Sequence, residues 1–255
     1  MTTTWILLRG LTRACHHWGG FAGMLEHTLG EARVVALELP GNGSLHRMRS
    51  PASIPAMAAY CRTALAQREI APPYRILAMS LGAMVAVAWA DAHPAEVTHC
   101  VLVNTSLRPF SPFYRRLRPA NYAALLRVAL GARAQATERR ILRMTSAVHA
   151  DDAELAQDWA EFRALHPVSA GNALRQVFAA ACYRAPRAQP PADTLFLAGA
   201  GDRLVDPDCS RAITLAWRRE LRVHPTAGHD LPLDDGPWVA SQVADWLAGR
   251  RSGDF

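Results

Sequence analysis

The chain has 255 residues, of which 50% are hydrophobic and 20% are charged, and its formal net charge is +6 at pH 7. This length predicts one large domain with room for an inserted subdomain, and the composition is typical of a soluble globular protein. No apolar run approaches the ~20 residues that cross a bilayer, so no membrane span is expected. The N-terminus lacks the basic region and long apolar core of a secretion signal, which predicts a cytoplasmic location.

Short β-type runs alternate with helical patterns through most of the chain. Several runs are continuously apolar, as parallel strands covered on both faces are. This alternation predicts an α/β fold with a doubly wound, mostly parallel sheet of about six strands. The expected strands are residues 5–8, 33–37, 75–78, 98–103, 194–198 and 220–223. The expected helices between them are residues 54–67, 81–92, 209–216 and 237–248.

Residues 105–192 interrupt the alternation. They contain no convincing strand, and prolines cluster where the segment begins and ends. We therefore expect a helical cap of residues 105–192, inserted in a core formed by residues 1–104 and 193–255. The helices expected in the cap are residues 121–130, 136–148, 153–164 and 172–182.

All 28 basic residues are arginine, and their distribution is uneven. The cap has 13 arginines against six acidic residues, whereas the rest of the chain has 15 against 16. The excess is consistent with a solvated face, or with a docking surface for an acidic partner, in which Arg115, Arg116 and Arg118 would take part. No nucleic-acid-binding motif accompanies the charge, so a nucleic-acid partner is not expected. Nine of these arginines lie close together, at positions 108, 115, 116, 118, 127, 133, 139, 140 and 143.

Cysteines and metal-binding patterns give no functional signal. The five cysteines are scattered and form no C-x-x-C pair, so neither a disulfide framework nor a zinc site is indicated. No cluster of His, Asp and Glu has metal-ligand spacing, and no G-x-G-x-x-G loop is present. We expect no metal and no cofactor.

Ser80 lies where a strand pattern passes directly into a helix, in the stretch Ala78-Met79-Ser80-Leu81-Gly82. A serine at such a corner is a nucleophile in esterases, whose usual signature is G-x-S-x-G. The same position suits an ordinary helix N-cap, which is the alternative interpretation.

Two further residues fit the chemistry of acyl transfer. A serine nucleophile needs an imidazole to take its proton and a carboxylate to orient the imidazole. Asp202 follows one expected strand and His229 follows the next, so both should lie near Ser80 at the carboxyl edge of the sheet. Asp206 is a nearby alternative for the acid. The chain order Ser, Asp, His is that of α/β-hydrolases.

On these residues the chain resembles the α/β-hydrolase superfamily, in particular its cap-bearing carboxylesterases. The resemblance implies Ser80 as nucleophile, Asp202 as acid and His229 as general base. It also implies that the backbone N–H groups of Leu11 and Leu81 form the oxyanion hole. The turn Pro40-Gly41-Asn42-Gly43-Ser44 is similar to the mainly structural P-G-x-G-x-S turn of the family.

The sequence departs from the family pattern at two positions. Arg9 stands where the family usually has histidine; it forms either a buried ion pair that supports the loop or a contact with an anionic substrate. Ala78 replaces the first glycine of the elbow, and its single extra methyl group should be tolerated because Gly82 is kept.

Aromatic residues are candidates for the substrate pocket, although such residues at helical spacing usually belong to the core. His16 and His17 could also contact substrate, but loop packing is the simpler interpretation. The candidates for pocket walls are Trp18, Phe110, Phe113, Tyr114 and Tyr122.

These observations predict a serine hydrolase that cleaves a carboxylic ester through an acyl-enzyme. An alternative is an esterase, thioesterase or acyltransferase that docks acyl carrier protein through the arginine-rich cap, because the chain loosely resembles esterases of pimeloyl-carrier methyl esters. A hydrolase-fold receptor or interaction module with little turnover is the alternative from another class. Epoxide hydrolases and dehalogenases have aspartate at the elbow, which argues against both.

Overall fold

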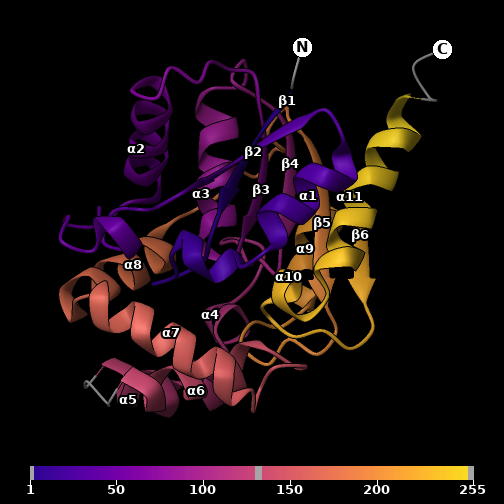
Figure 1. The fold of residues 1–255 in the computed structure, drawn as a ribbon. Helices are drawn as coiled ribbons and strands as arrows, with labels where there is room; N and C mark the ends of the chain where they lie inside the picture. Colours follow the sequence, from indigo (N-terminus) through magenta and orange to yellow (C-terminus); the bar gives the residue numbers. More distant parts are fainter. Residues whose placement is uncertain (1–2, 130–133, 252–255) are drawn as a thin grey trace.

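The computed structural model describes residues 3–129 and 134–251. Its six strands form one sheet in the order β2-β1-β3-β4-β5-β6, and every pair of neighbours is parallel. The predicted doubly wound parallel sheet is therefore confirmed (Figure 1). The strands are β1 (Thr3–Leu8), β2 (Ala32–Leu37), β3 (Tyr74–Met79), β4 (Val97–Val103), β5 (Asp193–Gly199) and β6 (Glu220–His224).

Helices cover both faces of the sheet. In β1, Ile6 and Leu8 face one hydrophobic cluster, while Trp5 and Leu7 face the other. Successive side chains of a strand point to opposite faces, so a strand covered on both sides needs consecutive apolar residues. The first face carries α2 (Ile54–Ala66), α3 (Leu81–Ala92) and α9 (Asp208–Trp217); the second carries α1 (Phe21–Leu29) and α11 (Gly236–Arg251).

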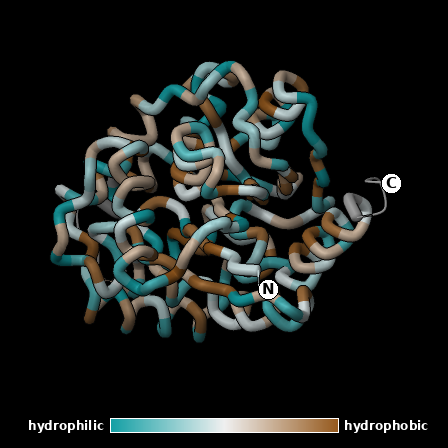
Figure 2. The backbone as a smooth tube through the Cα atoms, turned by 90° about the horizontal axis from the view of Figure 1, so that it is seen from above, coloured by the Kyte–Doolittle hydropathy of each residue, from teal (hydrophilic) through white to brown (hydrophobic). Residues whose placement is uncertain are grey.

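The expected core helices are all present. The described core also contains helices that were not predicted: η1 (Cys15–Trp18), α1, η2 (Gly43–Leu45) and α10 (Leu231–Asp234). Helix α1 follows two consecutive glycines and buries only Phe21 and Leu25. Four residues are too few to show helical periodicity in α10. Viewed from above, many hydrophobic stretches lie toward the middle of the molecule, and hydrophilic ones are frequent along its outline (Figure 2).

The segment between β4 and β5, residues 105–192, is here called the cap segment. Its ends are joined by an isolated parallel bridge between Arg108 and Arg184, and Ala185 N donates to Arg108 O at 2.7 Å. Figure 1 shows α5 to α8 together at one end of the sheet, away from the end where the chain termini lie. Its described helices are α4 (Phe113–Arg116), η3 (Pro119–Asn121), α5 (Tyr122–Ala129), α6 (Ala134–Thr145), α7 (Ala153–Leu165) and α8 (Ala170–Cys182). The predicted helix of residues 121–130 ends at Leu130, which lies outside the described residues. Arg133, one of the nine arginines noted in the sequence, also lies outside them.

Candidate active site

Ser80 connects β3 to α3 with φ 54° and ψ −116°. A positive φ is uncommon for a residue with a side chain and costs about 1–3 kcal/mol, so it persists only where the surrounding structure fixes it. A capping serine has extended backbone and accepts a hydrogen bond from the helix. The Ser80 side chain makes no such cap bond. The interpretation of Ser80 as an ordinary N-cap is therefore wrong.

Small residues allow this turn to pack against the end of β1. A methyl group on Gly82 would lie 2.5 Å from the carbonyl oxygen of Leu8, so only glycine fits. A methyl group on Gly10 would lie 3.3 Å from Cβ of Ser80, which places the loop after β1 directly against the serine. Ala78 is fully buried in the core. The close approach is therefore at Gly82, as expected.

Asp202 and His229 form a buried pair, although they come from different loops. Nδ1 of His229 lies 2.7 Å from Oδ2 of Asp202, and the two residues are 4% and 2% exposed. The other carboxylate oxygen of Asp202 accepts hydrogen bonds from the backbone N–H groups of Leu204 and Val205, at 2.8 and 2.9 Å. Both carboxylate oxygens of Asp202 therefore have partners, which fixes the orientation of the carboxylate.

The alternative acid, Asp206, points elsewhere. Its carboxylate oxygens lie 3.9 Å from nitrogens of Arg115 and Arg118, and one accepts a hydrogen bond from the backbone of Asp208 at 3.0 Å. Asp202 therefore has the position of a carboxylate that orients His229.

The surroundings of His229 act on its pKa in both directions. Burial lowers the pKa, whereas the charge and hydrogen bond of Asp202 and the charge of Asp230 raise it; Arg9 lowers it. The net result is a pKa above the ordinary value of 6.5. The imidazole can thus accept a proton on Nε2, and Asp202 beside Nδ1 stabilises the positive charge that results.

The contacts of Arg9, which stands where the family usually has histidine, decide between the two roles expected for it. Its guanidinium donates to both carboxylate oxygens of Asp230, at 2.9 and 2.5 Å, and to Sδ of Met79 at 3.1 Å. Arg9 is 2% exposed, so the alternative of a buried ion pair is the observed one. Met79 precedes Ser80 and Asp230 follows His229, so this one side chain ties the serine turn to the histidine loop.

Asn104 also holds the histidine loop in place, and it was not among the residues predicted for the site. It directly follows β4, has φ 46° and is 2% exposed. Its amide nitrogen donates to the carbonyl oxygens of Gly228 and His229, at 3.0 and 2.7 Å, and its amide oxygen accepts from Gly199 N at 2.9 Å. The only sequence signal is a polar residue just after an apolar strand.

The two predicted oxyanion donors, Leu11 and Leu81, lie in the loop after β1 and at the first residue of α3. Leu81 is the first residue of α3, so its N–H has no acceptor four residues back in the helix. Next to Leu11, the N–H of Thr12 donates to Oε1 of the buried Gln176 on α8, at 2.8 Å. The Gln176 amide nitrogen donates in turn to Oδ1 of Asn42, also at 2.8 Å, which involves the Pro40–Ser44 turn in supporting this loop.

The cap segment also touches the histidine loop. The N–H of Asp230 donates to the carbonyl oxygen of Thr145 at 2.7 Å. The carboxylate of Asp234 accepts hydrogen bonds from Gly228 N at 2.6 Å and from Ala147 N at 2.9 Å. The end of α6 is therefore anchored directly beside His229.

The five aromatic residues predicted as pocket walls are not gathered in one enclosure. Trp18 packs on Phe21 in the core, with the Arg9 guanidinium 4.7 Å from its ring centre. Phe110 is partly buried against Trp217. Phe113, Tyr114 and Tyr122 are exposed. Their role as pocket walls stays a prediction.

The three arginines predicted for docking are partly engaged within the chain. Arg115 lies 3.7 Å from the carboxylate of Asp208, in addition to its contact with Asp206. Arg116 donates to Ala180 O at 2.6 Å, and burial lowers its pKa. These contacts leave less of a free basic surface than the sequence predicts.

The two loop histidines pack against the cap. Nε2 of His17 lies 3.0 Å from a guanidinium nitrogen of Arg13, and burial followed by nearby arginine charge holds the pKa of His17 well below its ordinary value. A neutral His17 accepts that hydrogen bond. His16 is stacked on Phe162 and lies 2.8 Å from Asp158. The loop-packing interpretation is confirmed for both.

Within residues 3–129 and 134–251, no group of three or more His, Cys, Asp and Glu side chains is arranged to hold a metal ion. In the same ranges, no helix combines the length and apolar character that a bilayer crossing needs. The five cysteines are free thiols.

A protein-family model described as the alpha/beta hydrolase fold matches residues 6–236. The chain belongs to the α/β-hydrolase fold family. None of the curated proteins matches the chain. Solved α/β-hydrolase structures are similar over nearly its whole length, at identities that show the fold alone.

Three of these structures match over at least 90% of both chains. An enol-lactonase from Burkholderia xenovorans LB400 is 15% identical with a TM-score of 0.79, over 97% of this chain and 92% of that one. A meta-cleavage product hydrolase from Pseudomonas fluorescens IP01 is 17% identical with a TM-score of 0.77, over 97% and 91%. A thermophilic esterase from Thermogutta terrifontis is 19% identical with a TM-score of 0.70, over 97% and 90%.

Proposed function

We propose that this α/β-hydrolase is a serine hydrolase that cleaves a carboxylic ester through an acyl-enzyme. The observation that carries the proposal is the buried pair of His229 and Asp202, at the sheet edge where Ser80 occupies a strained turn. Its fold neighbours include proteins named as an esterase and an enol-lactonase, whose names denote cleavage of ester bonds.

In the proposed acylation, Oγ of Ser80 attacks the ester carbonyl and His229 takes the hydroxyl proton on Nε2. Asp202 holds the Nδ1–H and stabilises the imidazolium that forms. The N–H groups of Leu11 and Leu81 would face the oxyanion. The carbon–oxygen bond to the alcohol breaks, and His229 returns its proton to the leaving alcohol.

Deacylation repeats these steps with water. His229 takes a proton from water, the hydroxide adds to the acyl carbon, and the bond to Oγ of Ser80 breaks. The proton then returns to Ser80, so the products are one carboxylic acid and one alcohol.

The proposal includes the domain division. Residues 105–192 would roof the site as a cap on a core formed by residues 1–104 and 193–255, which the hydrogen bonds between α6 and the histidine loop support. The cytoplasmic location stays a prediction. No observation favours acyl carrier protein as a partner, because the docking arginines have contacts within the chain.

The test is hydrolysis of p-nitrophenyl esters of graded acyl length by wild type and Ser80→Ala, with a matched thioester series. The proposal predicts ester turnover by wild type and loss of at least about 10³-fold in the variant. Absence of turnover across the series would favour the receptor alternative. Faster cleavage of thioesters at equal chain length would favour the thioesterase alternative.

A further inference from the structure

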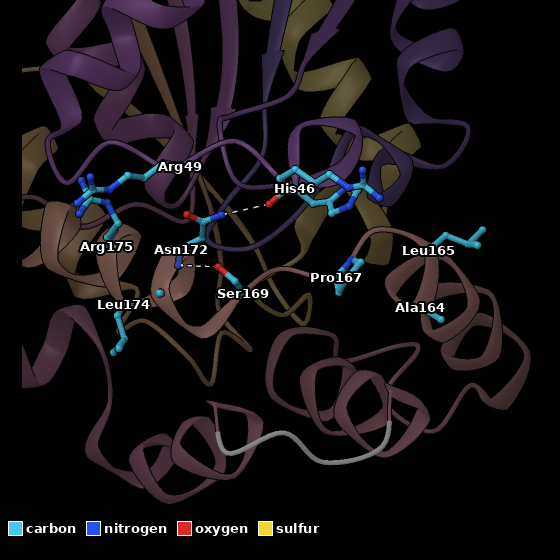
Figure 3. A pocket seen from close by; sticks show the side chains of 11 residues that line it. His46, Arg49, Ala164, Leu165, Pro167, Ser169, Asn172, Leu174 and Arg175 are labelled. Carbon is cyan, nitrogen blue, oxygen red and sulfur yellow. Dashed lines mark hydrogen bonds between the residues drawn. The ribbon is translucent and has the colours of Figure 1, made fainter.

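The described part of the chain has an open groove of about 1020 Å³, and none of Ser80, Asp202 and His229 lines it. It lies between the loop after the Pro40–Ser44 turn and the cap helices α7 and α8 (Figure 3). A volume of this size holds a drug-sized ligand. Since the proposed hydrolysis uses none of its lining residues, the groove needs its own explanation.

The charge of the groove is one-sided. Arg47, Arg49 and Arg175 line it together with His46, and none of its eleven described lining residues is acidic. Within the described part of the chain, no carboxylate lies within salt-bridge distance of these three arginines. In Figure 3 the side chains of Arg49 and Arg175 extend toward the same side of the groove. Arginines that line one groove without a counterion would stabilise an anion bound there.

The floor of the groove is rigid. Asn172 is buried on the first turn of α8, and its amide nitrogen donates to the carbonyl oxygens of His46 and Met48, at 3.2 and 3.0 Å. Its amide oxygen accepts from Ser50 N at 2.9 Å, and Nε of Arg175 donates to Ser50 O at 2.5 Å. Arg175 is thus held by Nε, while its terminal nitrogens are left for a ligand. Such preorganisation reduces the entropy lost on binding.

The lining of the groove also contains exposed apolar residues. Leu174 is 65% exposed and lies on the same side of Figure 3 as Arg49 and Arg175, whereas Leu165, 73% exposed, lies on the opposite side with Ala164 and Pro167. An exposed leucine next to arginines suits a molecule with an anionic head and an apolar chain. The planar guanidinium forms paired hydrogen bonds with phosphate oxygens, and three arginines match a group of more than one negative charge.

We propose that this groove binds a phosphate-bearing amphiphile as a single molecule. Its phosphate contacts Arg47, Arg49 and Arg175, and its apolar chain lies along Leu174. The site is independent of the proposed ester hydrolysis, so the failure of one proposal leaves the other standing.

The test is calorimetric titration of the full chain with n-octyl phosphate at low ionic strength. We expect one binding site, weakened at least tenfold in the Arg47→Gln/Arg49→Gln double variant. Both side chains are exposed, so the fold should be unaffected, which circular dichroism checks. Arg33→Gln, an exposed arginine on β2 away from the groove, is the matched control and should bind as wild type does.

Further titrations test the contributions of the phosphate group and of the apolar chain separately. Inorganic phosphate should bind more weakly than n-octyl phosphate, and Leu174→Gln should remove that difference. Octanoate should bind more weakly than n-octyl phosphate, and octyl glucoside should not bind. The proposal is overturned if n-octyl phosphate does not bind, if the double arginine variant binds it equally, or if octanoate matches it. Binding to phosphatidylglycerol vesicles without binding of n-octyl phosphate would also overturn it, in favour of a membrane surface.

Discussion

The guanidinium of Arg9 donates to both carboxylate oxygens of Asp230, although the two residues are 221 positions apart in sequence. The pair is almost fully buried. It joins the loop that follows β1 to the loop that carries His229. A buried ion pair is costly to break by removing one partner, because the remaining charge has no compensation.

Arg9→Met and Asp230→Asn should therefore each lower the free energy of unfolding by about 3–5 kcal/mol, and Arg9→Met/Asp230→Asn should lower it by less than the sum. Urea denaturation of the three variants measures this coupling. Strictly additive losses would mean that the pair contributes no specific interaction.

Substitutions of Asp230 and Arg9 should shift the pH dependence of kcat/KM in opposite directions. Asp230 raises and Arg9 lowers the pKa of His229. General-base catalysis needs the neutral imidazole, so kcat/KM should rise with pH through a pKa above 6.5 in wild type. Asp230→Asn should move the midpoint to lower pH and Arg9→Met to higher pH. Profiles of kcat/KM against pH measure both, and a shift of both variants in one direction would contradict the assignment.

The strained turn predicts an asymmetry between its two small residues. The methyl group of Gly82→Ala would lie 2.5 Å from Leu8 O, so the loop after β1 must move, at about 1–3 kcal/mol of stability and with a large loss of kcat. Ala78→Gly restores the usual motif and should cost roughly 0.5–1 kcal/mol, with kcat retained. Thermal denaturation and ester turnover compare them. Equal activity of the two variants would show that the close approach at Gly82 is unimportant.

The acid of the proposed triad is tested by a matched pair of substitutions. Asp202→Asn should reduce kcat by about 10⁴-fold, because the amide cannot orient His229 in the productive tautomer. Asp206→Asn should leave kcat within about twofold, since Asp206 pairs with arginines away from His229. Steady-state kinetics decide, and a larger loss for Asp206→Asn would reverse the assignment.

The sheet was predictable because its strands are continuous apolar runs, and both faces are covered. The choice between Asp202 and Asp206 was not, because both follow β5 within a few residues and only the contact with His229 separates them. Nor could the sequence pair Arg9 with Asp230, or predict that Asn104 joins the histidine loop to the end of β5, since these contacts depend on the parallel order of the strands. The exposed aromatics of the cap show a further limit, because helical spacing does not say which face of a short helix is covered.

The most direct test of the central claim is labelling of the folded protein with a fluorophosphonate, followed by peptide mass spectrometry. The proposed mechanism predicts one adduct, on the peptide containing Ser80, formed rapidly in wild type and lost in Ser80→Ala. His229→Ala should label at least about 10³-fold more slowly, because the hydroxyl then lacks its base. An adduct on another residue, or no adduct on correctly folded protein, would contradict the assignment of Ser80 as the nucleophile.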